Sequence, residues 1–366
     1  MKKVYFDGTH RVRRPEETWD AIDPLRETFG ITRVADVTGL DRLGVPVALA
    51  ARPAARSYPL SPGKGTSPLS ARISAVLAAA ELWHAEYACP QPAVVRTPAR
   101  DLLLPYGVEE LRRPAGSLLG ERTPLDWVSG NDAVSGAPVL VPRACVTVDH
   151  DAAPAYRPPL LTASTEGLAA GNSRAEAVTH ALYEVIERDC AASGGAAARR
   201  RGSVDATEVD DARCAALLRR VVRAGARPEL FSVPNRWDLP CFAARVSAPG
   251  LPAAAVGWGV HSAPGVALAR ALTAAAQRRL LDLTAGPGAP HRDRPAPAPL
   301  ASADGCAEAA PWRELARKGV EFTEDAEEMR WLAGRFARVT GRPPLVVDLS
   351  TEDAFSVVKV ITPRAG

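Results

Sequence analysis

The chain has 366 residues, enough for one large domain or two modest ones. Its 45 lysines and arginines against 42 aspartates and glutamates leave a formal net charge of +3. That charge is too small for a chain of this size to indicate a nucleic-acid or membrane-surface partner. The six cysteines lie far apart without a Cys-x-x-Cys pair, so neither a structural zinc site nor a disulfide framework is indicated.

The sequence shows no targeting or membrane-spanning segment. No run reaches about 18 uninterrupted apolar residues, and the first residues, "MKKVYFDGTHRVRRPEETW", lack the apolar core of a signal peptide. We therefore expect a cytoplasmic protein that keeps its cysteines reduced.

Valine-rich runs alternate with segments of helical period, which predicts an α/β or α+β fold. In chain order we expect strands at 31–37 and 45–51, a helix at 68–88, a strand at 137–148, helices at 173–191 and 208–224, strands at 229–233, 240–247 and 253–260, helices at 265–284 and 325–339, and strands at 343–348 and 356–361. The proline- and glycine-rich segment 286–305 is predicted to be an internal loop. The residues after it are too few for a separate core, so we expect them to complete the main sheet of a single domain, 1–366.

The helix at 68–88 has a readable beginning. Ser67 and Pro68 suit the N-cap and first turn, and a Gly63-Lys64-Gly65 loop is expected just before them. Lys64 in such a loop is either part of an ordinary turn or a phosphate ligand beside the helix N-terminus. It is not in a Walker A loop, because the glycine which that loop needs before the Gly63-Lys64 pair is missing. Glu81 lies in an otherwise apolar stretch, where a charge needs a partner or a route to water.

The helix at 173–191 carries a polar stripe. Ser173 with Glu176 matches a capping box, and Gly171-Asn172 before it suits a tight turn. Helical spacing places one set of ionisable residues on a shared face: Glu176, His180, Glu184, Glu187 and Arg188. This face is either solvated, with a weak Glu184–Arg188 pair, or a site where Glu184 and Glu187 offer carboxylate oxygens to Mg²⁺.

The helix at 265–284 places Arg270, Ala274, Gln277 and Arg278 on one face, with Arg279 beside them. This basic stripe either faces solvent or donates hydrogen bonds to phosphate oxygens, which the fork geometry of arginine suits.

Several stretches together resemble the YcaO family, and they cover nearly the whole chain, from about residue 7 to residue 363. They are "GITRVADVTGLDRLGVPVALAARPAARSYPLSPGKG", "SARISAVLAAAELWHAE", "STEGLAAGNSRAEAVTHALYEVIERDC", "ALARALTAAAQRRL" and "VVDLSTEDAFSVVKVITP". The resemblance implies a YcaO-like fold with mixed, largely antiparallel sheets flanked by helices and a nucleotide site between helices. It also implies an enzyme that uses ATP and Mg²⁺ to modify backbone amides of ribosomally made peptides. Such chemistry mainly requires positioning and charge neutralisation.

Carried over position by position, the resemblance implies a set of roles for individual residues. Glu81, Glu184 and Glu187 are similar to magnesium ligands, Arg188 to a phosphate contact, and Glu187 with Arg188 to the catalytic centre. The other nucleotide-binding positions that the resemblance implies are Lys64, Thr165, Asn172, Gln277 and Arg279.

The sequence departs from the family pattern at two positions. Ala78 and Ala274 replace family glutamates, so we expect weaker metal binding or fewer metal ions, or a site that no longer turns over ATP. Glu166, where the family often has asparagine, is a candidate to restore one carboxylate. The end "ITPRAG" does not match the proline-rich tail of many azole-forming members, and no fused leader-binding module is recognised.

Three functions follow from the resemblance. The favoured one is ATP-dependent cyclodehydration that yields an azoline or a macrocyclic amidine. The second is thioamide formation with a TfuA-like partner and a sulfur source, since "DGTHRVRRPEETW" resembles stand-alone or TfuA-associated members. The third is a non-catalytic paralogue that binds precursor peptide or a partner. The expected partners are a precursor peptide, a TfuA-like or leader-binding protein and a second copy in a homodimer, with no nucleic acid and no membrane.

Overall fold

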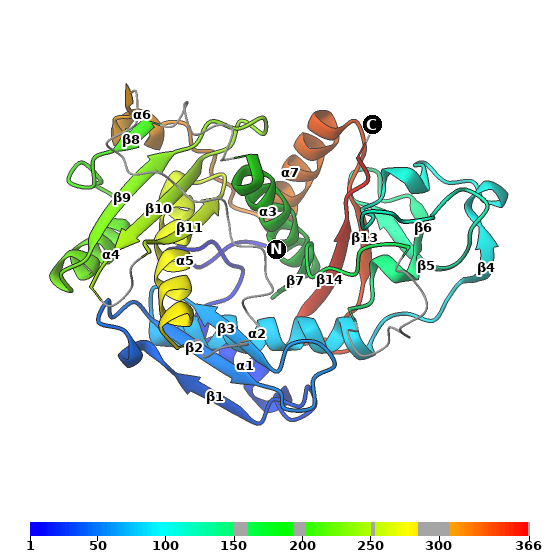
Figure 1. Cartoon of the computed structure of the whole chain (residues 1–366), viewed down its shortest axis with the longest axis horizontal. Coiled ribbons are helices and arrows are strands. Elements are labelled where there is room, and N and C mark those ends of the chain that lie inside the picture. The colour runs from blue at the N-terminus through cyan, green and yellow to red at the C-terminus, as the bar shows by residue number, and fades with distance from the viewer. Residues whose placement is uncertain (149–159, 194–201, 250–252, 285–307, 365–366) are drawn as a thin grey trace.

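The computed structural model describes residues 1–148, 160–193, 202–249, 253–284 and 308–364. These residues form three β-sheets and seven α-helices (Figure 1). Among the strands described, only β8 and β12 pair in parallel. The expected mixed α/β class with largely antiparallel sheets is therefore confirmed.

The three sheets lie in different parts of the molecule (Figure 1). The first contains β1 (Arg33–Asp36), β2 (Val47–Ala51) and β3 (Leu60–Lys64). The second has the order β11-β10-β9-β8-β12 and contains β8 (Gly202–Val204), β9 (Arg227–Ser232), β10 (Cys241–Ser247), β11 (Ala255–Val260) and β12 (Glu308–Ala309). The third has the order β4-β5-β13-β14-β7, with β6 on β5, and contains β4 (Val94–Pro98), β5 (Pro124–Asp132), β6 (Pro138–Pro142), β7 (Leu168–Gly171), β13 (Leu345–Asp348) and β14 (Ser356–Ile361).

Three long helices each pack on one of these sheets. Helix α2 (Pro68–Tyr87) lies on β2 and β3, α3 (Arg174–Ser193) on β7 and β14, and α5 (Pro264–Thr284) on β10 and β11. The remaining helices are α1 (Pro15–Ile22), α4 (Ala212–Arg223), α6 (Trp312–Ala316) and α7 (Asp325–Thr340).

Glycine allows two of these helices to lie directly on their strands. A Cβ at Gly63 of β3 would lie 2.1 Å from the Ala75 backbone N in α2. A Cβ at Gly257 of β11 would lie 2.2 Å from the Ala271 carbonyl O in α5. Only a residue without a side chain fits such contacts.

Helix α3 is the central element of the molecule (Figure 1). Its apolar side chains form one cluster with residues of two sheets: Trp258 and Val260 of β11, and Val358 and Val360 of β14. Burial on both sides explains why the helix keeps only one polar stripe.

Several sequence expectations need correction. The loop expected at Gly63-Lys64-Gly65 is wrong for its first two residues, because Gly63 and Lys64 pair with β2 in strand β3. The strand expected at 137–148 ends at Pro142, and a short 3₁₀ turn follows. Two helices and six strands have no counterpart among the expected ranges: α1, α6, β3, β4, β5, β7, β8 and β12.

The late strands do complete a sheet, since β13 and β14 lie between β5 and β7. The predicted loop at 286–305 lies outside the described residues. The single domain 1–366 stays a prediction. No helix within the described ranges is long and apolar enough to span a membrane.

Candidate nucleotide site

Helix α3 presents the polar stripe that its sequence predicts. Its core positions are fully buried, whereas His180, Glu184, Glu187 and Arg188 are half-buried. A stripe of partly exposed charges on an otherwise buried helix differs from the solvated face of a surface helix. It indicates that other parts of the protein partly cover the stripe.

The beginning of α3 uses the predicted cap with one change of partner. Ser173 Oγ accepts a hydrogen bond from the Glu176 backbone N at 3.1 Å. The Glu176 carboxylate accepts hydrogen bonds from the backbone N of Asn172 and of Val12, at 3.1 Å each, and only 6% of the residue is exposed. Asn172 is held on both sides, because its Nδ2 donates to Glu176 at 3.1 Å and its Oδ1 accepts from Thr18 at 2.9 Å. Glu176 therefore joins the N-terminal segment to α3.

Glu184 and Arg188 form an ion pair, as the one-turn spacing predicts. Arg188 Nη2 lies 2.5 Å from Glu184 Oε1 and also donates to Thr165 Oγ1 at 3.4 Å. Glu166, the candidate extra carboxylate, pairs with Arg112 and lies 4.0 Å from Arg188. The structure thus brings together three residues that the sequence assigned to the site.

Glu187 is paired with a helix that lies far away in the sequence. Arg270 Nη2 of α5 lies 3.4 Å from Glu187 Oε2, and both side chains are about one-fifth exposed, at 22% and 20%. Arg270 is on the basic stripe of α5, for which the sequence allowed phosphate binding, but it is not among the nucleotide-binding positions that the resemblance implied. The ion pair places the α5 stripe next to the α3 stripe.

Glu81 links α2 to the residues just before α3. Its Oε1 accepts a hydrogen bond from the Ala170 backbone N in β7 at 2.7 Å. Lys64 is the last residue of β3, close to the N-terminus of α2. The pKa of His180 is lowered mainly by burial, then by the charges of two arginines, and to a smaller extent by the charge of Lys64. Helix α5 therefore contacts the α3 stripe through Arg270, and α2 is joined to β7, the strand just before α3.

The described residues contain no group of three His, Cys, Asp or Glu side chains that could hold a metal ion. Glu81, Glu184 and Glu187 thus do not form a ready-made three-carboxylate cluster, and their role as metal ligands stays a prediction. Magnesium usually takes only one or two protein carboxylates and completes its shell with phosphate oxygens and water. Glu184 and Glu187, one turn apart and half-buried, fit that requirement.

The two remaining nucleotide-binding candidates lie on α5 in different environments. Gln277 is half-buried. Arg279 is only 4% exposed, and its Nε lies 3.1 Å from Asp41 Oδ2 while its Nη2 donates to the Pro249 carbonyl O at 2.7 Å. The structure thus gives the guanidinium of Arg279 protein partners, and its contact with nucleotide stays a prediction.

Lys359 is a site residue that sequence reasoning missed. Its ammonium group, 3% exposed in β14, donates hydrogen bonds to the carbonyl oxygens of Ser164 and Glu166, the second at 2.7 Å. These two bonds hold the loop that carries Thr165 against Arg188. Burial lowers the pKa of Lys359 to about 8. Its only sequence signal was a lysine inside the valine-rich run "SVVKVIT".

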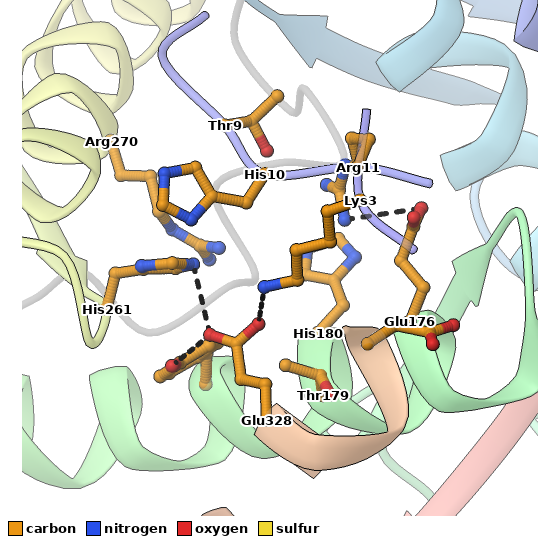
Figure 2. Close-up of a pocket in the computed structure, with 12 residues that line it drawn as sticks. Lys3, Thr9, His10, Arg11, Glu176, Thr179, His180, His261, Arg270 and Glu328 are labelled. Atoms are coloured by element: carbon orange, nitrogen blue, oxygen red, sulfur yellow. Dashed lines mark hydrogen bonds and ion pairs between the residues drawn. The ribbon is translucent and has the colours of Figure 1, made fainter. Parts of the chain in front are cut away.

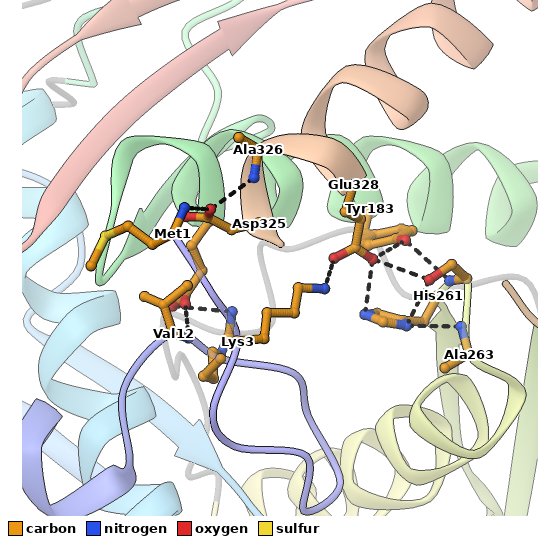
Figure 3. Close-up of polar contacts among 12 residues, drawn as sticks. Met1, Lys3, Val12, Tyr183, His261, Ala263, Asp325, Ala326 and Glu328 are labelled. Atoms are coloured by element: carbon orange, nitrogen blue, oxygen red, sulfur yellow. Dashed lines mark hydrogen bonds and ion pairs between the residues drawn. The ribbon is translucent and has the colours of Figure 1, made fainter. Parts of the chain in front are cut away.

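The N-terminal segment contributes a second polar cluster, also not predicted. It lies between α3, α5 and α7 (Figure 2). Lys3 forms a buried ion pair with Glu328 of α7, and Tyr183 of α3 donates to the same carboxylate at 2.7 Å (Figure 3). His261 Nε2 lies 3.6 Å from Glu328, and its Nδ1 accepts a hydrogen bond from the Ala263 backbone N at 3.0 Å. Because Lys3 and Glu328 are 325 positions apart in the sequence, no local sequence pattern predicts their contact.

The family model described as YcaO cyclodehydratase, ATP- and Mg²⁺-binding, matches residues 62–365. The chain belongs to the YcaO family. This membership confirms the resemblance and the expectation of ATP and Mg²⁺ as cofactors.

Three similar proteins show how far the likeness extends. An uncharacterized protein of Mycobacterium tuberculosis is 39% identical over 276 residues, which are 75% of this chain and 62% of the relative. The chain thus spans less than two thirds of that relative's length. An uncharacterized protein in the tfuA 3′ region of Rhizobium leguminosarum bv. trifolii is 35% identical over 288 residues, 75% of this chain and 67% of the relative. The structure of YcaO from Methanopyrus kandleri, bound with AMPPCP and Mg²⁺, has a TM-score of 0.74 at 24% identity and covers 99% of this chain and 94% of that one.

Proposed function

We propose that this YcaO protein binds Mg-ATP over the α3 stripe and uses it to activate a backbone amide of a ribosomally made peptide. One observation carries the proposal: two half-buried carboxylates of α3, Glu184 and Glu187, each have an arginine partner, the first on α3 and the second on α5. When Mg-ATP binds, these two carboxylates and two guanidinium groups would exchange each other for the metal ion and the phosphate oxygens. The carboxylates suit a divalent cation and the guanidinium groups suit phosphate oxygens.

Bound Mg-ATP would supply a phosphoryl group that turns the amide oxygen into a leaving group and a cation that neutralises charge. Glu184 and Glu187 would hold the metal, and Arg188 and Arg270 would bind phosphate oxygens as bidentate donors. Lys359 would act as a positioning residue, because its bonds to Ser164 and Glu166 fix the loop that places Thr165 beside Arg188. The protein then contributes positioning and electrostatic stabilisation.

Ala78 and Ala274, which replace family glutamates, are consistent with a metal site that has fewer carboxylates but still binds a metal ion. Ala78 and Ala274 are half-buried, as are Glu81 and Gln277 on the same helices. The absence of two carboxylates lowers the negative charge of the site, while Glu184 and Glu187 still offer the one or two carboxylates that Mg²⁺ commonly takes. A non-catalytic paralogue is the alternative that nucleotide binding tests.

The first candidate reaction is cyclodehydration. A Cys, Ser or Thr side chain, or an amine of the peptide, adds to the activated amide and gives an azoline or an amidine. The description of the family as cyclodehydratases supports this reaction.

The second candidate is thioamide formation with a TfuA-like partner. The Rhizobium relative is named for its position in a tfuA 3′ region and is 35% identical to this chain. That observation favours a sulfur donor as the nucleophile. A homodimer and a leader-binding partner also stay predictions.

Mass spectrometry of a precursor peptide tests the proposal and separates the two reactions. A candidate precursor peptide from the neighbourhood of this chain's gene is co-expressed with the chain, with and without a TfuA-like protein. Loss of one water indicates cyclodehydration, and exchange of one oxygen for sulfur indicates thioamide formation. The Glu187→Gln variant is the control and should leave the mass unchanged. An unmodified peptide with the wild-type chain under all conditions contradicts the proposal.

A further inference from the structure

A third arginine lies at the edge of the proposed nucleotide site. Arg112 comes from the segment before β5, and its Nη1 forms an ion pair with Glu166 Oε2. The same carboxylate oxygen lies 4.0 Å from Arg188 Nη1. Two guanidinium groups, from segments 76 positions apart in the sequence, therefore approach one anionic oxygen.

The backbone around Arg112 is held in place from two sides. Its carbonyl O accepts a hydrogen bond from the Thr162 backbone N at 3.0 Å. The carboxylate of Glu110, two residues earlier, accepts hydrogen bonds from Arg342 Nε and Nη2 at 2.8 and 2.7 Å. The Arg112 side chain is exposed, and Nη1 is its only nitrogen with a hydrogen bond to the described part of the chain. Its other donors are therefore available to a ligand.

Lys359 adds a positive charge beside the two arginines. The hydrogen bonds that its buried ammonium group makes to described residues go to two backbone carbonyl oxygens. Burial lowers the pKa of Lys359 to about 8, while the charges of Glu184 and Glu166 act in the opposite direction. Lys359 is therefore charged at neutral pH and interacts with both carboxylates. The cluster of Arg112, Arg188, Lys359, Glu166 and Glu184 thus holds three positive charges and two negative ones.

Magnesium binding at Glu184, as proposed above, would increase this excess of positive charge. Glu184 would then exchange Arg188 for the metal ion, which leaves three cations with the single carboxylate of Glu166. The surplus, three positive charges against one negative charge, suits a terminal phosphoryl group, which carries about two negative charges near neutral pH. Guanidinium groups bind such oxygens with paired, charge-assisted hydrogen bonds.

Arg112 lies on the exposed side of this cluster. The exposed fraction of the side chain falls from 59% in Arg112 to 34% in Arg188 and 3% in Lys359. A peptide substrate arrives from solvent, so the phosphoryl group that is transferred to it must lie toward the exposed side. Arg112 is therefore better placed for the terminal phosphoryl group than for the inner phosphates.

We propose that Arg112 is a further phosphoryl-binding residue, which binds the terminal phosphoryl group of ATP together with Arg188. In the nucleotide-free protein the Glu166 carboxylate occupies the place of that group. The inference rests on the proposed function and holds for both candidate reactions, because each begins with phosphoryl transfer. In that step the amide oxygen forms a bond to the γ-phosphorus, the bond from that phosphorus to the β–γ bridging oxygen breaks, and ADP leaves with the electron pair. Arg112 stabilises the charge of the transferred group and moves no proton.

The test compares Arg112→Gln with the control Arg100→Gln. Arg100 is another exposed arginine of the same segment, and its Nε lies 3.5 Å from Asp101 Oδ1. The non-hydrolysable analogue AMPPCP and ADP are each titrated with Mg²⁺ into the full-length protein in a calorimeter. Arg112→Gln should weaken AMPPCP binding about tenfold and ADP binding less than about twofold, because ADP lacks the terminal phosphoryl group. Arg100→Gln should bind both nucleotides as the wild type does.

Glu166→Gln tests whether the carboxylate occupies the place of the phosphoryl group. Because the change releases both arginines, this variant should bind AMPPCP more tightly than the wild type. Adding Arg112→Gln to it should again weaken AMPPCP binding, which excludes an effect of Arg112 through an unpaired Glu166. Weaker AMPPCP binding in Glu166→Gln would indicate that Glu166 is a metal ligand and would overturn the inference.

Turnover and stability complete the test. Phosphate release at saturating Mg-ATP and peptide should fall at least about tenfold in Arg112→Gln, and its unfolding temperature should match that of Arg100→Gln. Wild-type affinity for AMPPCP in Arg112→Gln, or an equal loss of affinity for AMPPCP and ADP, overturns the inference. If the wild type still modifies the peptide in that case, only the role of Arg112 fails. If the wild type binds no AMPPCP, the proposed function fails together with the inference.

Discussion

Arg270 of α5 and Glu187 of α3, 83 positions apart in the sequence, form an ion pair with Nη2 and Oε2 3.4 Å apart. Glu184, one turn earlier on α3, has its own partner in Arg188. These two proposed metal ligands are therefore each neutralised by one arginine before nucleotide binds. Binding of Mg-ATP would replace two ion pairs by carboxylate–metal and guanidinium–phosphate contacts, which conserves the balance of charge.

Glu187→Gln should abolish ATP turnover while the fold is retained. The change removes a negative charge from the proposed metal site but keeps the size of the side chain, and Glu187 is not a core residue. Phosphate release with peptide present should fall at least about a hundredfold. The unfolding temperature should match that of Glu327→Gln, a control at an exposed glutamate of α7. Full activity of Glu187→Gln means that the metal assignment is wrong.

Lys359 should make the stability of the nucleotide-free protein depend on pH in the alkaline range. Burial lowers its pKa in the folded protein to about 8 from 10.5. Between these values the unfolded chain binds a proton that the folded chain has lost, so the free energy of unfolding rises with pH. From pH 7 to pH 10 this residue should add about 2.5 kcal/mol.

Urea unfolding of wild type and Lys359→Met at both pH values measures this contribution. The difference between the two proteins removes the effect of other titrating groups. Lys359→Met should also raise the KM for ATP, because the loop that carries Thr165 loses its two hydrogen bonds. The same pH dependence in both proteins would exclude Lys359 as its origin.

Arg279→Ala should destabilise the protein. The substitution leaves Asp41 buried without its partner, and breaking a buried ion pair typically costs about 3–5 kcal/mol. Asp41→Ala should have a similar effect because it leaves the guanidinium unpaired. Thermal and urea unfolding check both variants. If Arg279→Ala keeps wild-type stability but has a higher KM for ATP, Arg279 binds nucleotide instead.

Ala78→Glu should strengthen magnesium binding. Ala78 is half-buried one turn before Glu81 on α2, so a glutamate there would add a carboxylate beside the proposed metal site. The Mg²⁺ concentration for half-maximal ATP binding should fall several-fold, on the order of tenfold at most. Gln91→Glu adds the same charge at an exposed position outside the helices and should have no effect. An unchanged Mg²⁺ requirement in Ala78→Glu places the metal elsewhere.

The sequence predicted the features that depend on local periodicity and capping. It gave the long helices, the Ser67 and Ser173 caps and the α3 stripe, because spacing and cap residues determine them locally. It did not predict contacts between distant segments. Lys3 meets Glu328 across 325 positions and Arg279 meets Asp41 across 238. No local signal in the sequence marks either partner, so the spacing that offers Arg279 as a nucleotide donor does not reveal its ion pair with Asp41.

Strands were harder to recognise than helices. Strand β5 has nine residues, but its sequence "PLDWVSGND" contains polar and turn-forming residues that hide the alternation. Strand β3, "LSPGK", contains proline and glycine, and the sequence predicts a loop for its last two residues, Gly63 and Lys64. Both are held by pairing with neighbouring strands, which overrides local propensity.

Isothermal titration of Mg-ATP into the full-length protein tests the central claim most directly. The account predicts saturable binding that requires Mg²⁺ in the wild type and is lost or strongly weakened in Glu187→Gln. Binding that is equally tight in Glu187→Gln, or no heat at millimolar nucleotide in the wild type, would contradict it.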